Sequence, residues 1–257
     1  MVKKPVVATP IQTERARLIL QFAREARRAF QESCDKTRLD RQKSGGGALT
    51  MAEQDLLRAM LVFAAAGLDS LVKQLIRDAL RPLAARDRAV QVELETFAAR
   101  QLRGDVSADE SEAASGRKFL AHVLVASTPL LGVTEQYITD LTGESMQSAE
   151  QLFKAVKALG IDPPALDLDP VELKKIFEAR NQIIHEMDIV LEARKKQARK
   201  RRSRTVEQMT DGADYLLAVG DRLITAVEEK LVTPGGATPE APVLVEVLPK
   251  LKKRTLA

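Results

Sequence analysis

The stretch LVFAAAGLDSLVKQLI, residues 61–76, decides the fold class of this chain. Its residues are apolar on nearly every side of a helix until Asp69, which is typical of a helix at the centre of a core. Thr50 and Glu53 precede it with the spacing of a capping box, and Pro82 follows it. The sequence therefore predicts a long central helix from about residue 50 to Pro82.

The remainder of the chain also has helical spacing of its apolar residues, and we find no alternating strand pattern outside the last 20 residues. Gly45, Gly46 and Gly47 interrupt the chain before the central helix, and Asp169 followed by Pro170 is a clear helix start. The other expected helices cover residues 11–34, 87–103, 117–127, 134–142, 146–159, 170–202 and 205–231. These expectations describe an all-α helical bundle.

The same pattern divides the chain into three parts. Residues 1–160 form an N-terminal helical part, and residues 161–232 hold two further helices, which we expect to share one compact domain with it. Residues 233–257 are rich in proline and glycine and are expected to form a loose C-terminal tail.

Composition limits the classes of protein that the chain can represent. Cys34 is the only cysteine of 257 residues, so an intramolecular disulfide and a cysteine-based zinc site are both excluded. We find no secretory leader and no apolar run close to 18 residues, so we expect a cytoplasmic protein without a membrane span. A net charge of +4 and a pI of 9.2 favour an acidic partner.

The segment EARNQIIHEMDIV, residues 178–190, places an arginine where an apolar residue is expected. On a helical wheel Arg180 lies near the middle of the apolar arc, and Asn181 lies at its edge, one turn before His185. The arc is formed by Leu173, Ile176, Phe177, Ile183, Ile184, Met187, Val190 and Leu191.

A guanidinium on such a face needs a carboxylate, a phosphate or water in front of it. One interpretation is a buried ion pair, for example with Asp69. The other is an anion-binding arginine beside a histidine, the side chain that exchanges protons near neutral pH. His185 lies about 140° from Arg180 on an ideal helix. Only the long arginine side chain, or a second copy of the helix, can therefore bring the two groups together.

A dense basic run follows this segment. Eight basic residues in positions 194–204 exceed what a helix C-terminus needs, so RNA phosphates are favoured as their partner over a merely solvated helix end. The run contains no aromatic residue for base stacking. The candidate RNA-binding residues are Arg194, Lys195, Lys196, Arg199, Lys200, Arg201, Arg202 and Arg204.

The motif Arg180, Asn181, then His185 resembles the signature of the HEPN family of all-helical domains, in which a polar residue follows the arginine. The resemblance covers the motif and the next helix, roughly residues 165–231, while the N-terminal half agrees mainly in being helical. It implies a HEPN-like bundle with additional N-terminal helices. Toxins of the family carry a tyrosine two residues after the histidine, where this chain has Met187.

The resemblance also implies a function: a metal-independent endoribonuclease that needs no cofactor and works as a homodimer through the motif helix. His185 is then the general base or acid, Arg180 stabilises phosphate charge, and Asn181 orients the imidazole or binds the phosphate. A toxin or phage-defence role, with a cognate antitoxin or regulatory partner, is the implied biology. The alternative is a non-catalytic helical RNA-binding or protein-interaction adaptor. His122 is expected to be a core histidine.

Overall fold

The computed structural model describes residues 11–42, 47–103, 110–189 and 201–233. Within these ranges the chain forms helices and no strand, apart from one isolated antiparallel bridge between Ile189 and Arg201, so the predicted all-α fold is confirmed. The elements are α1 (Ile11–Gln42), α2 (Met51–Ala84), α3 (Arg88–Arg103), α4 (Glu110–Val125), α5 (Pro129–Gly143), α6 (Ala149–Ala158), the 3-10 helix η2 (Pro163–Leu166), α7 (Pro170–Glu186) and α8 (Val206–Val232).

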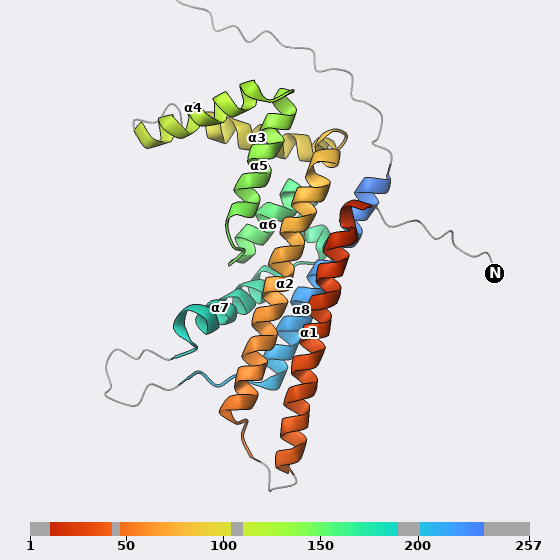
Figure 1. The fold of residues 1–257 in the computed structure, drawn as a ribbon, viewed down its shortest axis with the longest axis vertical. Helices are drawn as coiled ribbons and strands as arrows, with labels where there is room; N and C mark the ends of the chain where they lie inside the picture. Colours follow the sequence, from red (N-terminus) through yellow and green to blue (C-terminus); the bar gives the residue numbers. More distant parts are fainter. Residues whose placement is uncertain (1–10, 43–46, 104–109, 190–200, 234–257) are drawn as a thin grey trace, which may run out of the picture.

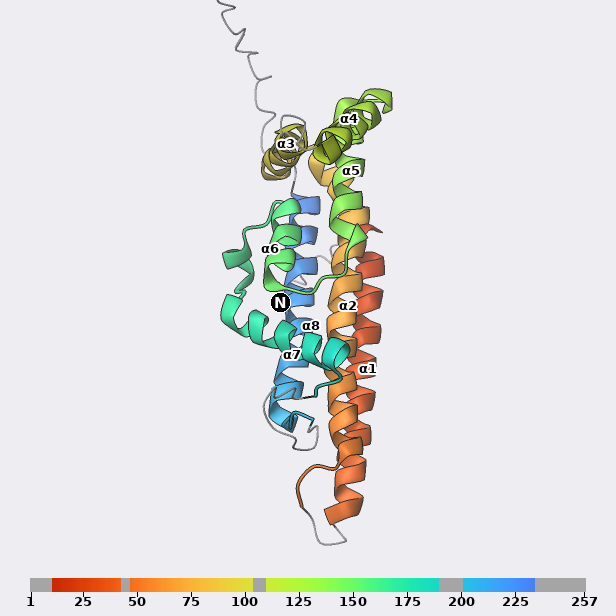
Figure 2. The same ribbon diagram turned by 90° about the vertical axis from the view of Figure 1, so that its left-hand side faces the viewer.

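Three long helices form the body of the molecule. Helices α1, α2 and α8 run along the long axis, α6 and α7 pack on the side away from α1, and α3 to α5 gather at one end (Figures 1 and 2). Helix α7 crosses the body at a steep angle and packs against α2 and α6 (Figure 2). Since α2 contacts α1, α5, α7 and α8, it is the element around which the others are arranged.

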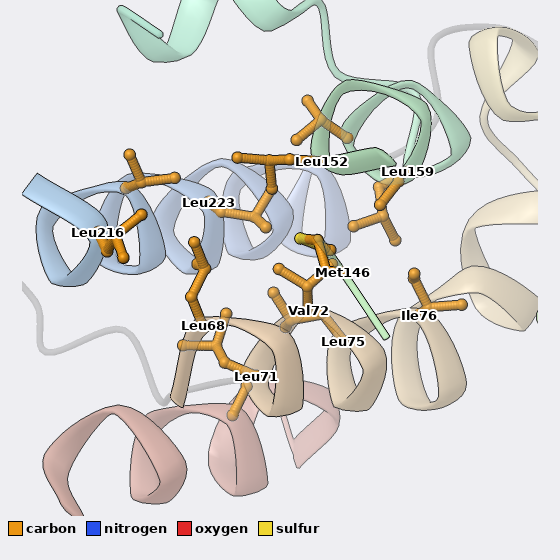
Figure 3. Packing of buried hydrophobic residues seen from close by; sticks show 14 of the residues in the cluster. Leu68, Leu71, Val72, Leu75, Ile76, Met146, Leu152, Leu159, Leu216 and Leu223 are labelled. Carbon is orange, nitrogen blue, oxygen red and sulfur yellow. The ribbon is translucent and has the colours of Figure 1, made fainter. Parts of the chain in front are cut away.

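The core is built on the stretch that the sequence singled out. Leu68, Leu71, Val72, Leu75 and Ile76 of α2 are fully or almost fully buried. Figure 3 shows these side chains meeting leucines from two other helices, Leu152 of α6 and Leu216 and Leu223 of α8. One continuous core therefore joins the N-terminal helices to the helices around the motif.

Helix α2 is, by length and composition alone, apolar enough to cross a membrane, which the sequence-based expectation did not anticipate. Half of its most apolar window is buried inside the bundle. One such helix is weak evidence of a membrane span, because the buried central helix of a soluble protein passes the same test.

A row of arginines on α1 faces acids on α8. The two helices run antiparallel, so successive arginines along α1 meet acids in reverse order along α8. The pairs are Arg17 with Glu228, Arg24 with Asp221 and Arg27 with Asp214. These partly exposed ion pairs fix the register of α1 against α8 and add little net stability each.

The capped helix starts agree with the sequence. Thr50 and Glu53 form the predicted capping box at α2, and the Asp169 side chain accepts hydrogen bonds from the backbone N–H groups of Val171 and Glu172 at α7. Gly160 follows α6 with a φ of 70°, in the left-handed region that a side chain disfavours, as expected after a helix end.

Several predicted boundaries are wrong. Helix α1 continues from the predicted end at Cys34 to Gln42, because no glycine or proline interrupts it. Pro82 lies inside the last turn of α2 instead of ending it, since a proline there loses one hydrogen bond while the helix continues to Ala84. Helices α4 and α5 begin earlier than predicted, and Thr128 caps α5 ahead of Pro129.

Helices α1 and α2 approach each other closely at Gly67. A Cβ atom placed there would lie 2.5 Å from the Cβ of Ala23. We expect Gly67→Ala to lower the free energy of unfolding by about 1–3 kcal/mol through overpacking. This loss occurs although alanine has a higher helix propensity than glycine. Urea unfolding measures this change. Gly143→Ala is the control, because nothing lies within 4 Å of its Cβ position. Equal stability of the two variants would contradict the close packing of α1 on α2.

Candidate functional site

The first half of α7 is anchored in the core and its second half emerges from it. Leu173, Ile176 and Phe177 are buried, whereas Ile184 is 38% and Met187 62% exposed. From Leu173 to Met187, the apolar arc predicted from the sequence is therefore only partly covered in a single copy of the chain, while Val190 and Leu191 lie outside the described residues. Arg180 lies at the transition and is half-buried.

Arg180 is held by its neighbour in the sequence. Its Nη1 atom donates a hydrogen bond of 2.9 Å to Oδ1 of Asn181, and it forms no ion pair within the described part of the chain. The ion pair considered from the sequence, with Asp69, is not formed. Asp69 instead accepts a 2.9 Å hydrogen bond from the backbone N–H of Met146 and pairs with Lys73 at 3.0 Å. The guanidinium charge of Arg180 is thus left available to an external anion.

Asn181 links Arg180 to the body of the protein. Its Nδ2 atom donates a 3.1 Å hydrogen bond to the carbonyl oxygen of Gln147, in the loop between α5 and α6. Because Met146 in the same loop is bound by Asp69, the contact chain reaches α2. The structure therefore places Asn181 against Arg180, and its side-chain hydrogen bonds are to Arg180 and to the Gln147 carbonyl, not to the imidazole of His185.

His185 lies in the last turn of α7 and is exposed. Since the two side chains leave the helix about 140° apart, Arg180 faces the α5–α6 loop side while His185 faces solvent. One copy of α7 therefore presents an arginine and a histidine on neighbouring but different faces.

The prediction that this helix continues to residue 202 is wrong. Helix α7 ends at Glu186, and Met187 and Asp188 both adopt the left-handed backbone conformation, with φ values of 50° and 58°. The N–H groups of Met187 and Asp188 both donate to the carbonyl oxygen of Gln182. The chain therefore turns sharply at Met187 and Asp188, directly after the helix ends at Glu186.

The cause of this turn is a buried cluster of Asp188, Arg58 and Arg204, which we call the Asp188 cluster. Asp188 is 0% exposed and Arg58 only 2%. Oδ2 of Asp188 accepts hydrogen bonds from Nε of Arg58 at 2.8 Å and Nε of Arg204 at 3.1 Å. Oδ1 accepts a further bond of 2.6 Å from Nη2 of Arg204. The carboxylate is thereby bound on both oxygens by two guanidinium groups.

Burial alone would raise the pKa of Asp188, but its hydrogen bonds to Arg204 and Arg58 outweigh this effect and hold the pKa below its usual value. The cluster was not among the features predicted from the sequence. The available signal was Arg58, a charged residue between Leu57 and Met60 on the otherwise apolar face of the central helix. A buried arginine of this kind requires a carboxylate, but the sequence did not say which.

The predicted RNA-binding run has two parts in the structure. Arg201 pairs with Asp55, Arg202 with Glu186 and Arg204 with Asp188, at 2.8, 2.8 and 2.6 Å. These three arginines are therefore engaged by acids of the same chain. Arg194, Lys195, Lys196, Arg199 and Lys200 lie outside the described residues.

His122 and Cys34 lie on other helices, α4 and α1. His122 is exposed on α4, so the expectation of a core histidine is wrong. Cys34 is buried, and burial, with Asp35 and Glu53 nearby, raises the pKa of its thiol, which makes it a poor nucleophile. Over the described ranges no three His, Cys, Asp or Glu side chains gather as a metal site would require.

No family model matches the chain, and no curated protein or solved structure matches it either. The similarity to the HEPN family therefore depends on the Arg180–His185 motif and its helical setting alone.

Removing the charge of Asp188 should destabilise the fold strongly. We expect Asp188→Asn to lower the free energy of unfolding by about 3–5 kcal/mol at neutral pH, because two buried guanidinium groups lose their counter-charge. Asp55→Asn, at an exposed acid that contacts the same Arg58, should cost about 1 kcal/mol or less. Denaturant unfolding of both variants tests this difference.

The same carboxylate predicts a pH dependence. The pKa of Asp188 is lower in the folded than in the unfolded chain. The contribution of its charge to the free energy of unfolding is therefore complete above the unfolded pKa. The contribution is lost as the pH falls through the folded pKa. Unfolding measured from pH 6 downward should therefore show a steeper loss of stability for the wild type than for Asp188→Asn. Parallel curves would contradict the assigned role of the carboxylate.

Proposed function

We propose that this protein is a metal-independent endoribonuclease of the HEPN type. The observation that carries the proposal is the state of Arg180 and His185. Both lie near the solvent-facing end of one helix, and neither is engaged by an acid in the described part of the chain. An arginine held in place by Asn181 but without a counter-charge is suited to bind a phosphate.

The chemistry needs only these residue types. The 2′-oxygen of RNA attacks the adjacent phosphorus, the bond from phosphorus to the 5′-oxygen breaks, and a 2′,3′-cyclic phosphate and a free 5′-hydroxyl result. His185 takes the proton from the 2′-hydroxyl or delivers one to the leaving 5′-oxygen. Arg180 neutralises the charge that develops on the phosphate oxygens. Asn181 positions Arg180 through its bond to the Gln147 carbonyl.

The proposed site is completed by a second copy of the chain. In one copy Arg180 and His185 leave α7 in directions about 140° apart, so one phosphate cannot easily meet both. Ile184 and Met187 are exposed beside them, which leaves an apolar surface for a partner. A two-fold arrangement of two α7 helices would cover this surface and bring Arg180 of one copy toward His185 of the other.

Arg194, Lys195, Lys196, Arg199 and Lys200 are the residues we assign to the RNA backbone. Arg201, Arg202 and Arg204 are engaged within the chain and are removed from this set. A toxin or phage-defence role in the cytoplasm, with a cognate antitoxin or regulatory partner, is part of the proposal and follows from the family resemblance alone.

A non-catalytic adaptor is the second candidate, and one observation favours it. Leu124 and Val125, at the end of α4, are 80% and 87% exposed. Adjacent exposed apolar side chains of this size are typical of contacts between proteins. An adaptor would use this surface and would not depend on His185.

RNA cleavage in the presence of EDTA distinguishes the two. We expect the wild type to cut a mixed RNA pool and leave cyclic phosphate ends, and His185→Ala to lower the rate about 10²–10⁴-fold. Arg180→Ala should lower it about 10²–10³-fold by loss of charge stabilisation. His122→Ala is the matched control, because it removes the other exposed histidine of the chain without touching α7. Cleavage by His185→Ala at the wild-type rate would exclude the proposed mechanism.

A further inference from the structure

The Asp188 cluster joins three segments that are distant in the sequence. Arg58 comes from α2, Asp188 from the residues just after α7, and Arg204 from the residues just before α8. Arg58 also donates through Nη2 to the carbonyl oxygen of Arg202 at 2.7 Å. The N–H of Arg202 in turn donates to the carbonyl oxygen of Asp188 at 2.7 Å. Main-chain and side-chain hydrogen bonds therefore both hold the segment after α7 and the segment before α8 against α2.

Arg204 holds the last turn of α7 from both sides of His185. Its Nη2 atom donates to Oε1 of Gln182 at 2.8 Å and to Oδ1 of Asp188 at 2.6 Å. Gln182 and Asp188 each lie three residues from His185, one before it and one after it. A single guanidinium thus spans the turn that carries the imidazole.

The backbone after His185 also needs this support. Met187 and Asp188 have left-handed φ values, which residues with a side chain adopt only where the surroundings hold them. Helix ends without such contacts fray. Without the Asp188 cluster the last turn of α7, and His185 within it, would lose its fixed geometry.

The surrounding charges belong to the same network. On α2, Arg58 is also bound by Asp55 at 3.0 Å, and Asp55 pairs with Arg201. On α7, Glu186 pairs with Arg202. Hydrophobic replacements of buried ion pairs are often as stable, so we assign this network to the geometry of the α7 end and not to net stability.

We propose that Asp188, bound by Arg58 and Arg204, is a positioning residue for His185. It acts through the end of α7 and does not contact substrate. The effect on cleavage depends on the ribonuclease proposed above, whereas the effect on the geometry of His185 does not.

The two histidines of the chain make this testable without an activity. Carbon–proton correlation spectra of the histidine-labelled full chain should show two sets of ring signals, one for each histidine, and His185→Ala assigns them. Arg58→Lys and Arg204→Lys keep the charge but lose the planar set of N–H donors of the guanidinium. In both variants the His185 signal should shift or broaden. The His122 signal should stay in place. Asp221→Asn, which breaks the exposed ion pair of α8 with Arg24 of α1, is the control and should leave both signals where they are.

Amide exchange and kinetics give two further measurements on the same variants. Exchange of the amides of residues 183–189 should rise about tenfold or more, while that of the central part of α2 stays unchanged. If the protein cleaves RNA, kcat should fall with little change in KM, because the RNA contacts remain. Arg204→Lys, at a partly accessible arginine, keeps the test valid if substitution of Arg58 or Asp188 prevents folding.

The outcomes separate the two proposals. An unmoved His185 signal and unchanged exchange in folded Arg58→Lys and Arg204→Lys would overturn the positioning role. If the His185 signal shifts in these variants but the wild-type protein cleaves no RNA, the result would support the positioning role and count against the ribonuclease.

Discussion

A fully buried carboxylate is stable only when its charge is met, and the contacts that meet the charge of Asp188 determine where α7 ends. Arg58 reaches it from the central helix and Arg204 from the start of α8. The chain must therefore turn after Glu186 and return toward α2 before α8 can begin. The exposed end of α7, the position of His185 and the engagement of Arg201, Arg202 and Arg204 all follow from this contact.

What the sequence predicted well was local. The capping box of Thr50 and Glu53 and the N-cap at Asp169 depend on residues within one turn, and both appear in the structure. The apolar stretch 61–76 identified the core helix because its pattern needs no knowledge of its partners. The end of α7 was mispredicted because a run of helix-favouring residues continues past Glu186, while the residue that ends the helix is bound by Arg58, 130 positions away.

The site shows the same division. The unusual position of Arg180 was visible in the sequence, and the structure adds that Asn181 and the Gln147 carbonyl hold it. The partner of Asn181 could not be predicted, since it lies in an irregular loop. The basic run was visible too, but its last arginines meet acids that only the fold brings close. Charge density alone could not show which arginines of the run are paired within the fold.

The central claim is that Arg180 and His185 act together across two copies of α7. Its most direct test is to co-express Arg180→Ala with His185→Ala, each inactive alone, and to measure RNA cleavage by the purified mixture. Random pairing makes half of the dimers mixed, each with one intact composite site, so we expect about a quarter of wild-type activity. No recovery from mixed dimers that demonstrably form would contradict a site shared between two chains.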